Sequence, residues 1–286
     1  MIKIATDGSA DMPKGWEEEY GIHLIPLSVV IGEEKYIQGR DIDSSNFYSL
    51  VREKRQPPKT SLPSPRQITE FYQSIARKGE EILSIHISSK LSGTYAAVKL
   101  AAEEIASELR VTPFDSGAGS AALGFMCREA RMLNKEGWEI PRIIQHLESI
   151  RDRVTVIFTL ENLEFAYLSG RINKLQTALS SLLRINPIIV LRDGLLSMSE
   201  RMSTRQKALN RVIEKVQQRV GDSVASLAVV HAAAPEAAAE MVEKIKKAIP
   251  SAREIVITEL SIPVAAHLGP GAIGIVAYPH AGGKER

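Results

Sequence analysis

The sequence has little cysteine and no excess of charge. Cys127 is the single cysteine among 286 residues. It cannot form an internal disulfide, and a cysteine-based zinc site is excluded, so the composition fits a reducing compartment. Lys and Arg together number 36 and Asp and Glu 34, giving a net charge of +2. A nucleic-acid footprint shows as a clustered basic excess, so we expect no nucleic-acid partner.

Long apolar runs are also lacking. No stretch of about 18 apolar residues exists that would span a bilayer. Asp7 follows the first apolar residues before the apolar core of a signal peptide could form. We therefore expect a cytoplasmic protein that has no membrane span, and any connection with lipid must be made through a pocket.

Several chemical signatures are missing as well. None of the six histidines stands in a His-Glu-x-x-His or similar metal spacing. There is no Gly-x-Ser-x-Gly elbow and no Gly-Lys-Ser/Thr phosphate loop, which weakens hydrolase and nucleotide-hydrolase readings. Gly117 and Gly119 match a dinucleotide pattern only loosely, without the acidic residue that contacts ribose. We expect no metal and no cofactor.

The length and the pattern predict two α/β domains, 1–160 and 161–286. In the first, strand-like segments alternate with helical ones, which predicts a parallel sheet with helices on both faces. Its expected strands are 2–5, 22–31, 82–87, 110–114 and 154–158. In the second, Asp193-Gly194 is the strongest hairpin signal of the chain. Further strands and helices after it predict a mixed sheet.

Ser92-Gly93-Thr94 follows a strand and opens a helix. Backbone N–H groups at a helix start bind anions, and open α/β sheets bind ligands at the carboxyl ends of their strands. The alternative is that Ser92 is only an N-cap.

Two other polar stretches have similar ambiguity. Thr60 and Ser61 lie in an expected loop, where their hydroxyls either donate to an oxyanion or make local turns. His267 precedes a Gly-Pro-Gly turn that lets backbone approach a ligand closely, and a core or capping role remains open. Arg171 and Arg201 are candidates for binding a carboxylate or phosphate, with an exposed surface arginine as the alternative.

Taken in order, these stretches resemble the DegV family of bacterial fatty-acid-binding proteins, whose members serve as the lipid-carrying subunit of fatty acid kinase. The resemblance covers essentially the whole chain. It departs at Gly8, where serine is usual, and at Ser169, where glycine is usual. The motifs that carry it are Thr6-Asp7-Gly8-Ser9-Ala10-Asp11, Thr60-Ser61-Leu62-Pro63-Ser64, Leu91-Ser92-Gly93-Thr94-Tyr95, Asp115-Ser116, Gly170-Arg171-Ile172 and His267-Leu268-Gly269-Pro270-Gly271.

The resemblance implies a DegV-like fold of two α/β domains with a long-chain fatty acid between them. It implies that Thr60, Ser92 and His267 hold the carboxylate. It further implies that Arg171 and, less closely matched, Arg201 serve phosphoryl transfer by an ATP-dependent kinase subunit. The protein would take its lipid from a membrane surface and would catalyse nothing by itself. The neighbours Ser61, Gly93 and Thr94 complete the candidate site.

Two other classes of function remain open. A serine hydrolase or acyl transferase would use Ser92 as nucleophile, His267 as base, and Asp7 or Asp115 to orient the base. A regulatory or structural interaction protein would have an empty interior.

Overall fold

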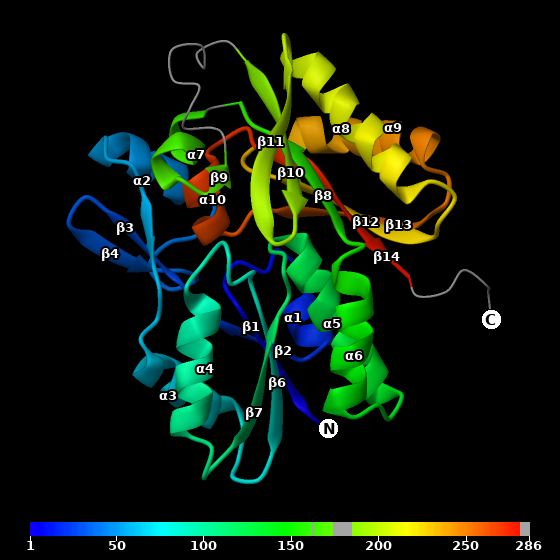
Figure 1. The fold of residues 1–286 in the computed structure, drawn as a ribbon. Helices are drawn as coiled ribbons and strands as arrows, with labels where there is room; N and C mark the ends of the chain where they lie inside the picture. Colours follow the sequence, from blue (N-terminus) through cyan, green and yellow to red (C-terminus); the bar gives the residue numbers. More distant parts are fainter. Residues whose placement is uncertain (162, 174–184, 281–286) are drawn as a thin grey trace.

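The computed structural model describes residues 1–161, 163–173 and 185–280 (Figure 1). Two sheets lie one above the other in that view, and a smaller third sheet lies beside them. The fold is α/β, with a parallel sheet in the N-terminal part and a mixed sheet in the C-terminal part, as the sequence predicts.

The first sheet is parallel and has the strand order β2-β1-β6-β7. Helices α3 and α4 pack on one face, and α5 with α6 lies on the other. The short α1 lies next to β2. The strands are β1 (Lys3–Asp7), β2 (Ile22–Ile25), β6 (Glu81–His86) and β7 (Arg110–Asp115). The helices are α1 (Trp16–Glu19), α3 (Pro65–Ile75), α4 (Thr94–Glu104), α5 (Ala121–Lys135) and α6 (Ile140–Arg151).

The second sheet is mixed and has the order β13-β12-β14-β8-β10-β11-β9. Helices α8 and α9 cover one face, while α5 packs against β14. The strands are β8 (Thr155–Thr159), β9 (Ile172–Asn173), β10 (Asn186–Arg192), β11 (Leu195–Met202), β12 (Ala225–His231), β13 (Ala252–Glu259) and β14 (Ile273–Pro279). The helices of this part are α7 (Leu163–Ser169), α8 (Arg205–Val220), α9 (Pro235–Ala248) and α10 (Ile262–Leu268).

Local signals placed several elements correctly. Ser64 caps α3 with the reciprocal capping box that the sequence predicts, its side chain accepting from the Gln67 backbone and its own N–H bonded by the Gln67 side chain. Asp193 and Gly194, with φ of 52° and 75°, form the turn between β10 and β11. Both residues need a left-handed backbone there, which explains why this dipeptide marks a hairpin.

The expected strand 22–31 is in fact two strands that belong to different sheets. Pro26 and Leu27 separate β2 from β3 (Ser28–Ile31). β3 pairs with β4 (Glu34–Ile37) and β5 (Lys59–Ser61) in a three-stranded antiparallel sheet. Thr60 therefore lies in a strand rather than in the loop that its proline-containing context suggested. The helix α2 (Phe47–Lys54) connects β4 to β5.

A second difference concerns the strand expected at 154–158. This strand, β8, does not join the parallel sheet but lies in the mixed one, antiparallel to both β14 and β10. The chain thus passes from the first sheet to the second between Arg151 and Thr155, shortly before residue 160. An apolar run predicts a strand without specifying its partner strand, because alternation and β-branched residues look alike in both sheets.

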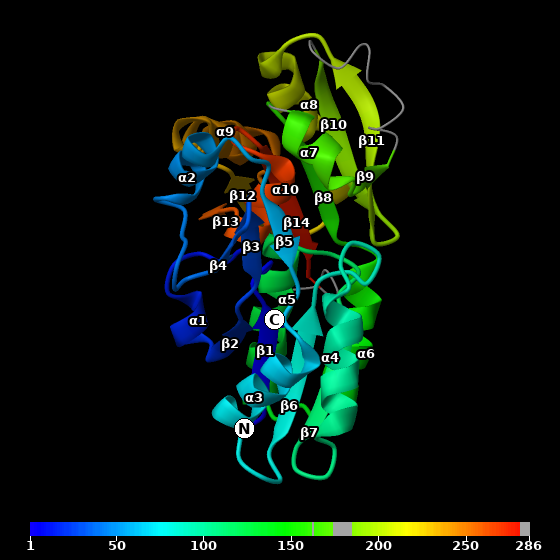
Figure 2. The ribbon, with the colours of Figure 1, turned by 90° about the vertical axis from the view of Figure 1, so that its left-hand side faces the viewer.

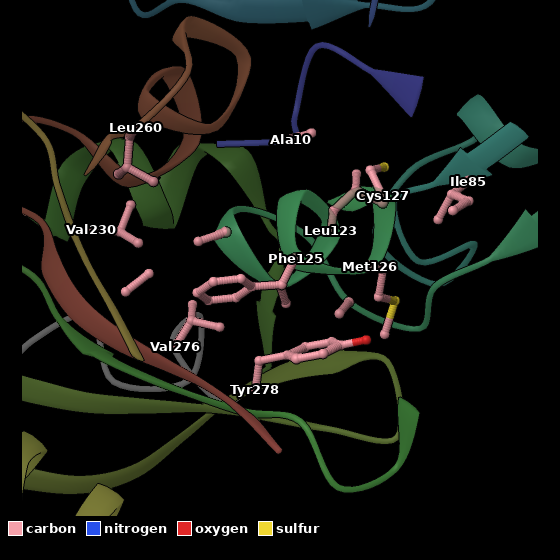
Figure 3. Packing of buried hydrophobic residues seen from close by; sticks show 14 of the residues in the cluster. Ala10, Ile85, Leu123, Phe125, Met126, Cys127, Val230, Leu260, Val276 and Tyr278 are labelled. Atoms are coloured by element: carbon pink, nitrogen blue, oxygen red, sulfur yellow. The ribbon is translucent and has the colours of Figure 1, made fainter. Parts of the chain in front are cut away.

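The largest apolar cluster joins the two sheets instead of lying within one of them. Phe125 on α5 packs against Tyr278 on β14, with ring centroids 5.5 Å apart. Val230 and Val276 of the second sheet belong to the same buried cluster as Leu83 and Ile85 of the first. Figure 3 shows the side chains of α5 between the two layers. The two parts therefore share a core, which fixes how the loops of one face the strands of the other.

Candidate functional site

A cavity of about 390 Å³ lies between the two parts of the chain. Loops at the carboxyl ends of β1, β6 and β7 form one wall, and the face of the second sheet that looks toward them forms another. Its volume falls within the range of about 300–1,000 Å³ typical of small-molecule sites. Most of its lining is aliphatic, with polar groups at a few positions. The apolar lining includes Ile87, Val156, Phe158, Leu196, Val230 and Val276.

Thr60 and His267 meet in this lining. The Thr60 Oγ1 and His267 Nε2 atoms lie 3.0 Å apart, a hydrogen-bond distance. Thr60 is on β5, and His267 is in the last turn of α10. Helix α10 packs on β3 and β5 (Figure 2), so the contact joins the C-terminal part to the small sheet.

The His267 imidazole is neutral at physiological pH. Burial, and then the nearby Arg171 guanidinium, lower the pKa of His267 from 6.5 to about 4. Its Nδ1 atom is buried and has no hydrogen-bond partner among the described residues. If Nε2 accepts from Thr60, then Nδ1–H is a free donor. If Nε2–H donates to Thr60, the Thr60 hydroxyl is the free donor. Either tautomer leaves a donor for an anion.

Ser92 and Gly93 also line the cavity, at the start of α4. The N-cap of α4 is Gly93, which has no side chain to cap the helix, so Ser92 is not the N-cap. Ser92 Oγ lies 2.9 Å from Thr94 Oγ1 and accepts weakly from the Thr94 N–H at 3.3 Å. Thr94 is fully buried behind Ser92 and is not part of the lining. Ser61 does line the cavity.

The two candidate arginines lie in different places. Arg171 is exposed and lines the cavity, and its guanidinium donates to the Ser169 carbonyl. Arg201 is exposed near the end of β11 and does not line the cavity. The structure therefore places Arg171 with Thr60 and His267, and Arg201 outside this group.

The Gly-Pro-Gly turn brings backbone close to its neighbours. Gly271 has a φ of 76°, and a Cβ there would lie 2.1 Å from the Glu161 carboxylate. Gly269 similarly leaves room for the Phe165 ring. The Arg205 guanidinium donates to the Gly271 carbonyl. Glycine is thus required here for close packing under α7 and for a left-handed backbone, and the turn fixes the end of α10 that carries His267.

A hydrolytic triad does not form around Ser92. The hydroxyl of Ser92 bonds to Thr94, while His267 bonds to Thr60. Asp7 bonds to His86 at 2.9 Å, and Asp115 accepts from backbone N–H groups. Among the described residues no hydrogen bond joins Ser92, His267 and a carboxylate in the sequence that such a mechanism needs.

Sequence reasoning missed a buried polar chain beneath the site. Asp7 bonds to His86 Nδ1, His86 Nε2 lies 2.7 Å from Ser84 Oγ, and Ser84 lies 2.7 Å from the Tyr72 hydroxyl. Burial alone would raise the pKa of Asp7, but hydrogen bonds from His86, Ser9 and Ile87 lower it. The order Asp-His-Ser is that of a catalytic triad, yet all three side chains are fully buried. No substrate reaches them, so we assign them to structure.

Asp11 links the two parts of the chain directly. Its Oδ1 accepts from the Ser261 backbone N–H, the N-cap of α10, at 2.7 Å, and its Oδ2 accepts from the Ser120 hydroxyl. Burial raises the pKa of Asp11 from 3.8 to about 6. The same helix carries His267 in its last turn, so Asp11 fixes the start of the helix that brings His267 to the cavity.

Gly8, where the family resemblance leads one to expect serine, leaves space for the Gln38 side chain. A Cβ at Gly8 would lie 1.9 Å from Gln38 Oε1. The Gln38 amide donates to the Gly8 carbonyl at 3.0 Å and accepts from the Leu27 N–H at 3.4 Å. Gln38 thus fills the space beside Gly8 and bonds to the backbone of Leu27, which lines the cavity.

Within the described residues, no group of three or more His, Cys, Asp or Glu side chains could hold a metal ion. No described helix is both long and apolar enough to cross a membrane.

Comparison with known proteins places this architecture. A family model described as an uncharacterised protein of the DegV family matches residues 1–280. Protein DegV of Bacillus subtilis (strain 168) is 32% identical over 276 residues, which cover 96% of this chain and 98% of the relative. A DegV domain-containing protein of Streptomyces coelicolor is 31% identical over 276 residues, covering 96% of this chain and 97% of the relative.

Solved structures have the same fold. A DegV family protein from Thermus thermophilus, described by its fatty acid binding, is 29% identical, with a TM-score of 0.90 over 98% of this chain and 99% of its own. DegV from Bacillus subtilis, described as a fatty acid binding protein, is 30% identical, with a TM-score of 0.87 over 98% and 99% of the two chains. The family match, the relative at 32% identity and the shared fold show that this chain belongs to the DegV family.

Proposed function

We propose that this protein binds a long-chain fatty acid, with the carboxylate at Thr60, Ser92 and His267 and the acyl chain in the aliphatic cavity. The observation that carries the proposal is the 3.0 Å contact between Thr60 and His267 in the lining of an otherwise apolar cavity. Because the imidazole is neutral and one donor of the pair is free, the site suits an anion that brings its own charge. The fatty acid binding ascribed to the Thermus and Bacillus relatives supports the same ligand class.

The aliphatic lining supplies the affinity. Burial of each methylene contributes about 0.8 kcal/mol, so ten methylenes contribute roughly 8 kcal/mol before the cost of ordering the chain. The carboxylate adds hydrogen bonds to neutral hydroxyl and imidazole donors, each worth about 1.5–3 kcal/mol because the acceptor is charged. The head group thus orients the ligand, and the chain holds it.

We further propose that the bound acid is presented in the cytoplasm to an ATP-dependent kinase subunit, which forms the acyl phosphate, after the acid has been taken up at a membrane surface. Phosphoryl transfer depends on positioning and charge neutralisation more than on a base. Arg171 supports this role, because it is exposed and also lines the cavity beside His267. In this account the protein is a carrier, and the catalyst is its partner.

The test is a titration of delipidated protein with palmitate and oleate. Binding is measured by calorimetry or by displacement of a fluorescent fatty acid. We expect one acid bound per chain and no turnover of acyl esters by the protein alone. Ester hydrolysis that depends on Ser92 would support a hydrolase instead, and no uptake of either acid would refute the proposal. Acyl-phosphate formation after addition of a fatty acid kinase and ATP then tests the presentation step.

A further inference from the structure

The lipid cavity adjoins a second, larger hollow of very different character. A cleft of about 1,450 Å³ opens between the two parts of the chain, and its lining includes six Lys or Arg and four Asp residues. The two hollows share Lys90, Val156, Ile157 and Leu191. The aliphatic cavity and the charged cleft are therefore separated only by residues that line both of them.

The boundary between the two hollows runs across the strands of the second sheet. Alternate residues of β8 share the face toward the cavity: Phe158 lines only the cavity, Val156 lines both hollows, and Val154, directly before the strand, lines only the cleft. On β14, Val276 lines only the cavity. On β10, Leu191 lines both hollows. On the cavity face of the sheet, the change from one hollow to the other thus occurs at Val156 and at Leu191.

A row of four aliphatic side chains stands at this level. Val276 pairs with Val156 in the β14–β8 ladder, and Leu191 pairs with Leu196 in the β10–β11 ladder. Val190 pairs with Ile157, which puts Leu191 beside Val156 across β10 and β8. Val276 belongs to the cluster that joins the two sheets, and the other three pack against it, so all four share the face that forms the cavity.

This row lies at the end of the cavity away from the head group. Strand β14 begins at Ile273, directly after the Gly-Pro-Gly turn that follows His267. From Ile273 to Val276 the strand advances by about 10 Å, at about 3.3 Å per residue. An acyl chain whose carboxylate lies at His267 and Thr60 therefore runs along β14 toward Val276 and Val156.

The tip of the β10–β11 hairpin is anchored to the loop after β6, beside the row of aliphatic side chains. Lys90 Nζ donates to the Asp193 carbonyl at 2.8 Å, and Ser88 Oγ donates to the Gly194 carbonyl at 2.9 Å. A Cβ at Gly194 would lie 2.6 Å from the Ser88 hydroxyl, so the hairpin tip sits in direct contact with the loop after β6. These bonds hold Leu191 and Leu196 against the N-terminal part of the chain.

We propose that Val156 and Leu191 set the longest acyl chain that the protein binds well, by closing the lipid cavity against the charged cleft. The inference rests on the proposed fatty acid binding. Methylenes that stop before the row are buried, and each raises the affinity by about fourfold. Methylenes that pass the row enter a space lined by charged groups and gain little.

The test compares the affinities of laurate, myristate, palmitate, stearate, arachidate and behenate for the wild type, Leu191→Ala and Val156→Ala. Each member adds two methylenes, together worth about fifteenfold in affinity when both are buried. In the wild type we expect the affinity to rise along the series and stop rising at one member. In both alanine variants the rise should continue for at least one further member, because truncation of the row extends the apolar space. Val156→Phe should stop one member earlier.

Val264→Ala is the matched control. Val264 lines the same cavity from α10, near His267, and does not line the cleft. This variant should weaken every acid by a similar factor and leave the stopping point unchanged. Variants of Leu191 and Val156 that bind fatty acids with the wild-type stopping point would overturn the assignment of the row alone. A wild type that binds no fatty acid would overturn the proposed function and this inference together.

Discussion

The Thr60 hydroxyl and the His267 imidazole lie 3.0 Å apart, although 207 positions separate them in the chain. One belongs to the small sheet near the N-terminal part, and the other belongs to a helix of the C-terminal part. A carboxylate bound by both groups therefore bridges the two parts of the molecule. A ligand that binds only the folded state stabilises it, by about 2.7 kcal/mol at a free concentration of a hundred times Kd.

Removal of a head-group hydroxyl should weaken binding without destabilising the free protein. Thr60→Ala and Ser92→Ala each remove a donor to a charged acceptor, worth about 1.5–3 kcal/mol, so affinity for palmitate should fall at least about tenfold. The melting temperature of the ligand-free protein should stay near that of the wild type. Ser74→Ala, an exposed hydroxyl on α3, is the control and should keep full affinity. A loss of stability with unchanged affinity would make these hydroxyls structural.

His267 should titrate far below the usual range of histidine in the free protein. Burial and Arg171 lower its pKa to about 4, so histidine NMR should show a midpoint near that value. Addition of palmitate places a negative charge nearby and should raise the midpoint. A midpoint near 6.5 in the free protein, or no response to palmitate, would contradict the position of His267 in a dry head-group site.

Asp11 should make stability depend on pH in the acidic range. Its pKa is raised by burial from 3.8 to about 6, so the folded state holds this proton more tightly than the unfolded state does. The stability it contributes is present below about pH 3.8 and is lost as pH rises through about 6. Urea denaturation should show the wild type losing up to about 3 kcal/mol relative to Asp11→Asn across this window. A constant difference between the two proteins would refute the raised pKa.

Arg171 should matter for transfer more than for binding. Because neutral donors hold the carboxylate, Arg171→Ala should change palmitate affinity by less than about threefold, while acyl-phosphate formation with a kinase and ATP falls at least about tenfold. Arg201→Ala should have the smaller effect, since Arg201 lies outside the cavity. Arg66→Ala, which removes an exposed ion pair with Glu70, serves as control. Normal acyl-phosphate formation by Arg171→Ala would refute the role, and loss of palmitate binding would place Arg171 at the head group.

Local chemistry made much of the fold predictable. Ser64 with Gln67, and Asp193 with Gly194, each require one backbone geometry, and the structure has it. The same holds for the alternation of strands and helices in the first sheet. The sheet to which β8 belongs was not predictable, because an apolar strand is compatible with either sheet until its neighbours are known.

The site was predictable in its residue types and less so in its contacts. His267 and Thr60 stood out beside glycine-rich or hydroxyl-rich stretches, but their mutual hydrogen bond depends on how α10 packs on β5. The chain from Asp7 through His86 to Ser84 left no signal in the sequence, because buried polar groups find partners that are distant along the chain.

The most direct test of the central claim is mass spectrometry of the organic extract from protein purified from a bacterial host. The apolar cavity and the Thr60–His267 pair predict one dominant class of bound molecule, a long-chain fatty acid, present at close to one per protein chain. Extracts from Thr60→Ala should contain much less of it. Protein that carries no fatty acid as purified, and takes up neither palmitate nor oleate afterwards, would contradict the account.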